Sequence, residues 1–541
     1  MTSRPYPDLH DHLAALDRHG LLVRVRRPIN KETELHPLVR WQFRGGIPEA
    51  QRRAFLFEQV VGARGEAYAM PVLVGALAAS RRIYSLGMGC PLEEIGPRWC
   101  QAARNPLPPR RVDSAPAQEV LHLGDENEEP GRGIDMLPVP ISTPGFDIAP
   151  FLTAGHWVTR DPDSGIQNVG TYRAQVKGRM RLGLNASIEM GQGIHEHWCK
   201  YRARGRPMPA AIVVGAPPVF SYAAAQKLPR DVDEFAVAGA LAGAPLNAVR
   251  TMTVDLLVPA EAEIIIEGFV DTQALEPEGP FGESHGYVNL QELNPFFDVT
   301  AISHRRDAIF LSIISQVTPS ESSLIKQVAY EPLFLAYLRD EHGLASVAQV
   351  ALHEPLTNLR KLVVVQMREP GEAEAWKALE AAAAYHPSIG KLIIAVDEDI
   401  DPRNPDALFW ALSYRMNPER DLRLLPGRSA GHGPLGMQAE GADAALLFNA
   451  VRKRAYPPVS LPRREYMERA RAIWEELALP PLRPEAPWHG YPLGLWSESF
   501  EEAAERAVRG DYWRTGEELI ERRVPGGEPN TSTFRPDAKQ Q

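Results

Sequence analysis

Short apolar segments alternate with segments of helical period along most of the chain, and this alternation is the strongest constraint on its fold. Apolar runs with the length of strands are found at residues 21–25, 211–215, 263–270, 309–317, 361–366 and 392–396. Helical spacing is found at residues 373–385 and 466–477, and at 8–20, where Asp8 can cap the helix and Gly20 can end it. Strands interleaved with helices predict an α/β or α+β fold, and nearly all-apolar strands predict sheets covered on both faces.

The length of 541 residues predicts two or three domains. An acidic, glycine-bearing stretch at residues 124–133 is typical of an exposed connection, and a second boundary is expected between residues 317 and 333. Residues 479–496 contain five prolines among aromatic side chains, which indicates an extended arm packed on another surface or subunit. A last helix is expected at 501–508, and the polar tail beyond Val524 is expected to be disordered.

Composition and charge exclude several classes of protein. The net charge of -10 argues against a protein that binds nucleic acid or an anionic membrane surface. No window approaches the roughly 20 apolar residues of a membrane helix, and the first residues do not have the pattern of a signal peptide. The three cysteines, Cys90, Cys100 and Cys199, are widely separated, so we expect a reduced, cytoplasmic protein without a disulfide framework.

The segment from Glu278 to Glu283 carries the strongest chemical signal. Its two carboxylates stand five residues apart on a backbone bent by Gly279, Pro280 and Gly282, which is incompatible with one regular helix. Gly282 tolerates a positive φ, so the segment predicts a turn that presents both acids to one cavity. Acids held near each other and near an arginine have their pKa values pushed apart, as general acid–base chemistry requires. The alternative is a surface turn with solvated acids.

Other candidate sites are weaker. The alternate residues His195, His197 and Cys199 could bind zinc from a strand, but they form no HExxH motif, and a helix start with partly exposed histidines is favoured. Walker A and G-x-S-x-G patterns are absent, which disfavours P-loop and α/β-hydrolase chemistry. Lys391 precedes an apolar strand that ends in Asp397; this strand either runs out into solvent or lets the lysine reach a phosphate or carboxylate. Glu234 reads as a first-turn helix residue.

Taken together, these segments resemble the UbiD-type decarboxylases, which use prenylated flavin mononucleotide (FMN). The resemblance covers residues 8–455, and its main motifs are Asn168-x4-Arg173, Pro229 followed by Glu234 and Gly239, Glu278-Gly-Pro-Phe-Gly-Glu283, and the run from Lys391 to Asp401. It implies an N-terminal α/β domain at 1–124, a central split-β-barrel flavin domain at 125–325 and a C-terminal α/β domain at 326–478. An arm, a helix and a tail at 479–541 would serve oligomerisation.

The resemblance implies a catalytic role for Arg173, Glu278 and Glu283. Arg173 would orient the leaving carboxylate through a forked pair of hydrogen bonds, and Glu278 would hold Arg173 in place. Glu283 would protonate the carbon after CO2 has left, while the flavin serves as the electron sink. The resemblance also implies that the cofactor is contacted by Thr153, Asn168, Val169, Tyr172, Arg173, Gln192, Glu234 and Lys391.

The metal site implied by the resemblance departs from the family pattern. Mn²⁺ or Mg²⁺, with K⁺ nearby, would join the flavin phosphate to Asn168, Glu234 and a histidine. The expected histidine falls on Gly193 in this chain, so His195, His197 or water would take its place. This departure keeps open a rival hypothesis, a non-catalytic subunit of a multi-component carboxylase.

The resemblance leaves the substrate open. Ser284 and the loop that holds His432 and Leu435 are expected to line the substrate pocket, and the small Ser284 favours an aromatic or heteroaromatic acid, with a hydroxylated one among the options. An α,β-unsaturated acid or an aryl thioester is the alternative. A flavin prenyltransferase would supply the cofactor, and a dimer or larger homo-oligomer is expected. A glycosidase-like hydrolase that uses Glu278 and Glu283 is the second rival, and it would be colourless.

Overall fold

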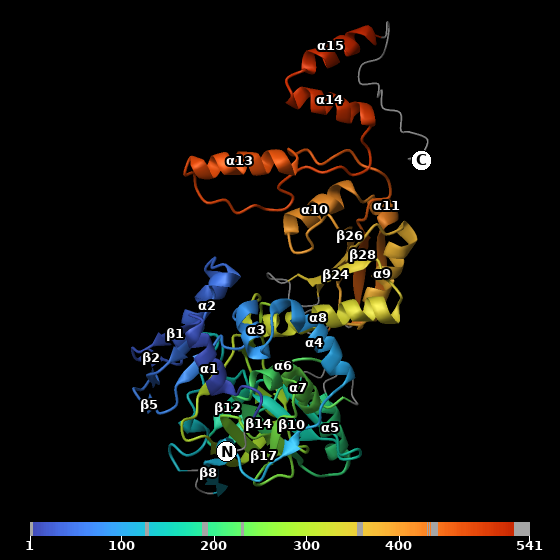
Figure 1. The fold of residues 1–541 in the computed structure, drawn as a ribbon. Helices are drawn as coiled ribbons and strands as arrows, with labels where there is room; N and C mark the ends of the chain where they lie inside the picture. The colour runs from blue at the N-terminus through green and yellow to red at the C-terminus, as the bar shows by residue number, and fades with distance from the viewer. Residues whose placement is uncertain are drawn as a thin grey trace.

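A computed structural model describes residues 4–124, 129–186, 193–228, 232–353, 361–429, 431, 433 and 442–523 of the chain. The N-terminal and central segments form one body, a C-terminal sheet with its helices lies above it, and three helices stand apart at the top (Figure 1). The predicted α/β class is confirmed. Both sheets and helices contribute to the cores, as the alternating sequence pattern requires.

A curled antiparallel sheet of nine strands forms the centre of the body. Its order is β11–β10–β14–β17–β22–β13–β12–β9, with β8 paired to β22. The apolar runs predicted at 211–215 and 263–270 are β14 (Met208–Val214) and β17 (Ile264–Val270), which are buried along almost their whole length. The other strands of this sheet are β8 Val120–Leu123, β9 Phe151–Leu152, β10 His156–Arg160, β11 Gln167–Thr171, β12 Ala174–Gly178, β13 Arg181–Gly183 and β22 Phe296–His304.

The N-terminal segment adds a mixed sheet of order β1–β3–β6–β23, whose last strand comes from the central segment. The strand predicted at 21–25 is β1 (Leu22–Val25). The run at 309–317 is a strand only over β23 (Phe310–Ser312), because the Ile313 backbone leaves the sheet and hydrogen-bonds the Thr153 hydroxyl. The other short strands here are β3 Ala54–Phe57 and β6 Val72–Val74, with β2 Ile29–Asn30, β4 Val60–Val61 and β5 Ala67–Tyr68 in one small sheet and β7 Arg110–Arg111, β15 Asn247–Arg250 and β16 Leu257–Pro259 in another.

A side-chain cap marks the start of the first helix of this body. The helix predicted at 8–20 is α1 (Leu9–Arg18), in which the Asp8 carboxylate accepts the Asp11 amide at 2.9 Å, and Gly20 follows it with a φ of +66°. The other helices of the body are α2 Leu35–Arg44, α3 Arg81–Met88, α4 Leu92–Arg104, α5 Gly193–Ala203, α6 Pro218–Ala224 and α7 Glu234–Ala242, with single turns at Glu49–Gln51, Pro116–Gln118 and Ile134–Met136.

The C-terminal domain is a mixed sheet of order β24–β25–β26–β28–β27, which includes the strands predicted at 361–366 and 392–396. Helix α8 (Glu321–Ala336) joins this domain to the body: Leu324 and Ala329 belong to the body's hydrophobic core, whereas Tyr330 and Phe334 belong to the core of the C-terminal domain. The elements that follow are a π turn at Tyr337–Glu341, β24 Val347–Leu352, β25 Leu362–Met367, α9 Glu372–Ala384, β26 Leu392–Asp397, α10 Pro405–Tyr414, α11 Pro418–Asp421, β27 Leu422–Ser429 and β28 Ala442–Asn449.

The acidic residues at the end of β26 differ in exposure: Asp397 and Asp399 are largely enclosed, whereas Glu398 and Asp401 are exposed. Asp397 is only 2% exposed, and its carboxylate accepts a hydrogen bond from Arg415 at 2.8 Å. Arg415 also donates to both Asp399 oxygens, at 2.7 and 2.6 Å. The interpretation as a solvated strand end is therefore wrong for Asp397 and Asp399, which lie in an ion-pair network, but it agrees with the exposure of Glu398 and Asp401.

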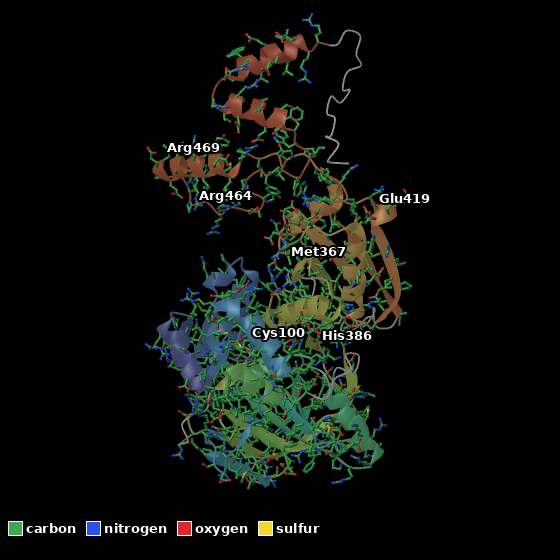
Figure 2. The ribbon with its side chains drawn as sticks, turned by 45° about the vertical axis from the view of Figure 1, so that its right-hand side comes forward. Cys100, Met367, His386, Glu419, Arg464 and Arg469 are labelled. Atoms are coloured by element: carbon green, nitrogen blue, oxygen red, sulfur yellow. The ribbon has the colours of Figure 1, made fainter. Side chains whose placement is uncertain are left out.

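The proline-rich arm packs on the C-terminal domain of its own chain. The Tyr491 hydroxyl donates to Asp399 at 3.0 Å, and the Asn404 side chain donates to the Ala486 carbonyl at 3.1 Å. The helices around the arm are α13 Arg464–Glu476, α14 Glu498–Val508 and α15 Tyr512–Glu521, of which the sequence did not predict the last. These helices contain no buried residue, and Figure 2 shows Arg464 and Arg469 on α13, away from the body. Within the described ranges, no helix has both the length and the apolar character needed to cross a bilayer.

Candidate active site

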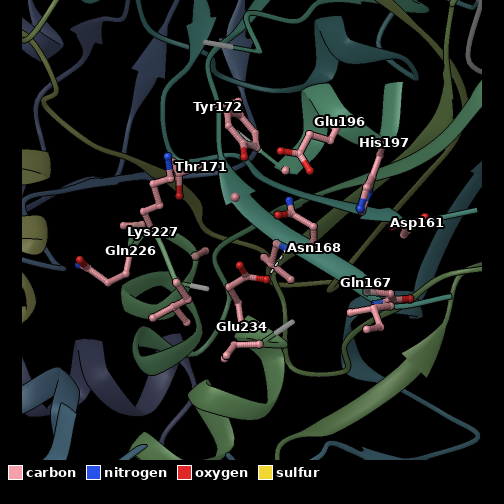
Figure 3. Close-up of a pocket in the computed structure, with 18 of the residues that line it drawn as sticks. Asp161, Gln167, Asn168, Thr171, Tyr172, Glu196, His197, Gln226, Lys227 and Glu234 are labelled. Atoms are coloured by element: carbon pink, nitrogen blue, oxygen red, sulfur yellow. Dashed lines mark hydrogen bonds between the residues drawn. The ribbon is translucent and has the colours of Figure 1, made fainter. Parts of the chain in front are cut away.

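A polar cavity of about 340 Å³ lies where β11 meets α5, α6 and α7 (Figure 3). Four predicted cofactor or metal residues, Asn168, Val169, Tyr172 and Glu234, line this cavity. Arg173 follows Tyr172 directly and is described below. Lys200, Lys227 and Lys326 add positive charge to the walls, whereas Asp161 and Glu196 add negative charge.

Glu234 is held at the start of α7. Asp233 caps this helix by accepting a hydrogen bond from the Phe235 amide at 2.9 Å, and Glu234 lies in the first turn, as predicted. The Glu234 carboxylate accepts the Val169 amide at 3.0 Å across the cavity (Figure 3). Burial raises the pKa of Glu234 to about 7, because the charged form loses its hydration. A bound cation would favour the charged form and reverse this shift.

Asn168 is the second oxygen donor of the cavity. It shares a face of β11 with Gly170 and Tyr172, because side chains alternate along a strand. The Asn168 side-chain nitrogen is buried and meets no hydrogen-bond acceptor among the described residues. Burial also raises the pKa of Tyr172 far above its usual value, so its phenol stays protonated. A buried amide without a partner indicates a place where a ligand binds.

Gly193 is the first residue of α5 and touches Asn168. A Cβ added to Gly193 would lie 2.2 Å from the Asn168 Oδ1 atom, so this position accepts no side chain while Asn168 stays in place. The glycine at the position of the expected histidine is therefore part of the shape of the cavity.

Helix α5 presents one face to the cavity. Gly193, Glu196, His197 and Lys200 line it, and their spacing is that of successive helical turns. His195 does not line the cavity; its ring lies 3.5 Å from the Cys199 sulfur, which corrects its assignment as a metal ligand. The predicted helix start is confirmed, but His197 is buried, hydrogen-bonded to Thr159 at 2.9 Å, and its pKa is lowered by burial to about 4. No cluster of three or more His, Cys, Asp or Glu side chains suited to a metal is found in the part of the chain that the structure describes.

The structure brings Arg173, Glu278 and Glu283 together from segments more than 100 residues apart. Arg173 donates to both Glu278 oxygens, through Nε at 3.0 Å and Nη2 at 2.8 Å. Its remaining nitrogen, Nη1, contacts Glu283. Glu278 is fully buried and also accepts a hydrogen bond from Asn294 at 3.2 Å, whereas the Glu283 side chain retains 14% exposure. Arg173 is therefore fixed on one side and meets a more accessible acid on the other.

Two small hairpins hold these acids. Glu278 ends β18 (Glu276–Glu278), which pairs with β21 (Glu292–Asn294), and Glu283 follows β19 (Phe281–Gly282), which pairs with β20 (Val288–Asn289). Gly279 has a φ of +89°, as a turn glycine would. Gly282 has no positive φ. A Cβ atom added to it would lie 2.4 Å from the Thr143 hydroxyl, so this position needs a residue without a side chain.

Other predicted site residues lie elsewhere. Lys391 pairs with Asp443 at 3.0 Å and does not line this cavity, so its place beside the flavin stays a prediction. The Thr153 hydroxyl is buried and engaged by Ser312 and Ile313 outside the cavity lining. Ser284 lies in the turn after Glu283. Gln192, His432 and Leu435 lie outside the described residues.

Several cavity residues were missed by sequence reasoning. Glu196 and Lys200 stand three and seven positions after Gly193, so a helix that begins at Gly193 would have indicated them. Lys200 donates to Asp161 at 2.6 Å, which ties α5 to the loop after β10. Lys227 and Lys326 had no local signal, because they approach the cavity from separate segments.

Comparison with known proteins gives matches over most of the chain. Sequence models of the UbiD family match at 13–103 (the N-terminal domain of 3-octaprenyl-4-hydroxybenzoate carboxy-lyase), 110–317 (its Rift-related domain) and 325–438 (its C-terminal domain). An evolved dimeric form of the UbiD-class enzyme HmfF from Pelotomaculum thermopropionicum, solved with prenylated FMN, is 30% identical, with 84% of this chain and 97% of that chain covered at a TM-score of 0.72.

Two more distant structures share the fold. The vanillic acid decarboxylase of Sedimentibacter hydroxybenzoicus, in its closed form, is 24% identical, with 88% of this chain and 100% of that chain covered at a TM-score of 0.72. The 3,4-dihydroxybenzoic acid decarboxylase AroY of Klebsiella pneumoniae is also 24% identical, with 88% and 97% covered at a TM-score of 0.70. At this identity the likeness concerns the fold.

Proposed function

Since this chain belongs to the UbiD family of carboxy-lyases, we propose that it catalyses the reversible, non-oxidative decarboxylation of an aromatic or heteroaromatic carboxylic acid with prenylated FMN. The observation that carries this proposal is the contact of Arg173 with two acids of unequal exposure, Glu278 and Glu283. Bound prenylated FMN would supply the sink for the electron pair left on the substrate carbon.

Arg173, Glu278 and Glu283 then each have a separate role. Glu278, fully buried and paired with two nitrogens of Arg173, holds the guanidinium in one orientation. The substrate carboxylate binds Arg173 Nη1 in competition with Glu283. Once displaced from Arg173, Glu283 carries the proton that replaces CO2 on the substrate carbon.

The polar cavity would hold the phosphate end of the cofactor. Its unpartnered Asn168 amide, the adjacent glycine and the Glu234 carboxylate fit a phosphate bound through Mn²⁺ or Mg²⁺, with K⁺ as a further cation. We assign the third protein ligand to Glu196, which shares the cavity-facing side of α5 with Gly193, in place of His195. Carboxylate and amide oxygens suit these hard cations better than imidazole does.

A cofactor and turnover assay tests the proposal. The full chain is produced with and without a flavin prenyltransferase, and its absorbance and CO2 release are measured with aromatic, heteroaromatic and α,β-unsaturated acids and an aryl thioester. Deuterium exchange at the product carbon reports the reverse half of the reaction. Flavin absorbance with turnover of a ring acid is expected. A colourless protein with hydrolytic activity, or a protein that binds no flavin, would instead favour the hydrolase or the non-catalytic subunit.

We also propose that α13, α14 and α15 bind a second copy of the chain. None of their residues is buried, and several apolar side chains here are largely exposed: Trp513 is 74% exposed, Ile520 66% and Leu477 63%. Exposed apolar side chains gathered on neighbouring helices are typical of an oligomer interface. A dimeric form of the 30% identical enzyme supports a second copy as the partner.

A further inference from the structure

A second cavity, of about 210 Å³, lies between the body and the C-terminal domain. Its walls come from four parts of the chain: Arg52 and Arg81 before and at the start of α3, the first turns of α8, residues 351–353 at the end of β24, and Arg403 in the loop before α10. It shares no lining residue with the cavity assigned to the flavin phosphate. A ligand here would touch the body, α8 and the C-terminal domain together.

Positive charge predominates in this cavity. Arg52, Arg81 and Arg403 line it, against a single lining acid, Glu49. Arg81 is neutralised by Glu49 at 2.5 Å and also donates to Gln327 at 2.7 Å. Arg403 is paired with Glu331, which does not line the cavity. Two of the three guanidinium groups therefore already have carboxylate partners.

Arg52 has no such partner. Its Nε atom is buried and makes no hydrogen bond to any described residue, and its guanidinium forms no ion pair there. The guanidinium lies over the Phe43 ring, 5.0 Å from the ring centroid, which fixes its plane. Burial lowers the pKa of Arg52 because the cation loses hydration, and the nearby Glu49 carboxylate offsets this loss only in part. A half-buried guanidinium in this state favours an anion beside it.

Helix α8 begins at the same cavity. Its 16 residues start after the cap Ser320, and the side chains of Ser320 and Ser323 line the cavity. The positive end of the helix dipole therefore faces the same space as Arg52. Hydroxyls, a helix N-terminus and an arginine fork together make a site for tetrahedral oxyanions.

We propose that this cavity binds a small phosphate group, either inorganic phosphate or a phosphomonoester, between the body and the C-terminal domain. The site is independent of the proposed decarboxylase chemistry, because none of its walls belongs to Arg173, Glu278, Glu283 or the flavin cavity. A phosphate bound here would bridge Arg52 to the start of α8 and increase the stability of the junction.

Calorimetric titration of the full-length, flavin-loaded protein tests this proposal. Sodium phosphate and glycerol 3-phosphate are titrated separately, in a buffer without other multivalent anions, and the tighter of the two identifies the source of the phosphate group. Saturable binding is expected, and Arg52→Gln should weaken it by about tenfold or more, the worth of one charge-assisted contact. Arg44→Gln, an exposed arginine at the end of α2, is the matched control and should bind as the unchanged protein does.

A second variant distinguishes loss of the binding site from misfolding of the protein. Ser323→Glu retains the pattern of a capping box while it places a carboxylate beside Arg52, so it should abolish phosphate binding without lowering the melting temperature or the flavin content. Absence of saturable binding by either phosphate, or equal binding by Arg52→Gln and the unchanged protein, would overturn the proposal. Flavin absorbance is recorded in parallel, so that loss of the catalytic cofactor is distinguished from loss of this site.

Discussion

Gly193 and Asn168 lie so close together that a Cβ atom added to Gly193 would be 2.2 Å from the Asn168 Oδ1 atom. A larger side chain at residue 193 would therefore displace the Asn168 side chain, which we propose as a metal ligand. Packing at residue 193 thus affects the position of a proposed ligand.

We expect Gly193→Ala to displace Asn168 and lower the flavin content of the purified protein by about tenfold, as changes around metal ligands commonly do. Flavin per chain is measured by absorbance after production with a prenyltransferase. Gly178→Ala is the control, because a Cβ there would meet no atom within 4 Å. Full flavin retention in Gly193→Ala would show that Asn168 does not hold the cofactor.

Glu283→Gln should lower turnover at least about 100-fold, because an amide cannot deliver the proton that replaces CO2. Flavin content should stay unchanged, since Glu283 does not line the phosphate cavity. The control is Glu276→Gln, an acid on β18 that pairs with Lys177 and Arg181 instead of Arg173. Normal turnover in Glu283→Gln would remove this residue from the mechanism.

Acidification should destabilise the protein through three buried histidines. Burial lowers the pKa of His12 to about 4, and that of His36 and His156 to about 3. Each is neutral in the folded state but takes up a proton on unfolding below pH ~6.5, the ordinary pKa of an exposed histidine. Its contribution to stability is therefore full above that pH and is lost as the pH falls toward its pKa in the folded protein.

Each of these histidines should reduce the free energy of unfolding by up to about 1.4 kcal/mol per pH unit below its unfolded pKa. Urea midpoints between pH 7.5 and 5 measure the slope. His12→Asn should make the slope shallower, whereas His19→Asn, an exposed residue after α1, should leave it unchanged. Equal slopes in both variants would contradict the assignment.

Charges on α15 should separate the proposed dimer. Trp513→Glu with Ile520→Glu removes two exposed apolar side chains, each worth about 1.5–3 kcal/mol when buried at an interface. We expect the dissociation constant to rise by at least about 100-fold, measured by light scattering after size exclusion. Arg522→Glu, a charge change just after the same helix, should remain dimeric; a monomeric unchanged protein would overturn the interface.

Local signals accounted for much of the fold. Helices α1 and α7 begin after Asp8 and Asp233 because capping depends on neighbours a few residues away. The runs that became β14 and β17 were recognisable because both faces of each strand are covered. Helix α15 was missed because the polar residues that follow it indicated a disordered tail, although its apolar residues recur at helical spacing: Tyr512, Trp513, Leu519 and Ile520.

The site depended on contacts that no local pattern encodes. The pairing of Arg173 with Glu278 and Glu283 across more than 100 residues came from the family resemblance, because spacing alone left a solvated turn open. The small size of Gly282 is required by Thr143, which is distant in sequence. The pairing of Lys391 with Asp443 was not predicted, because Asp443 comes from a separate strand.

Helix α8 has one further consequence, for the construction of chimaeras. Its first half packs in one hydrophobic core and its second half in the other, so a crossover placed just before it would pair a foreign helix with a native body. A crossover placed after Ala336 would keep Leu324 and Ala329 with their native body but pair Tyr330 and Phe334 with a foreign core, so exchanges of C-terminal domains between relatives should use donors that match these two positions.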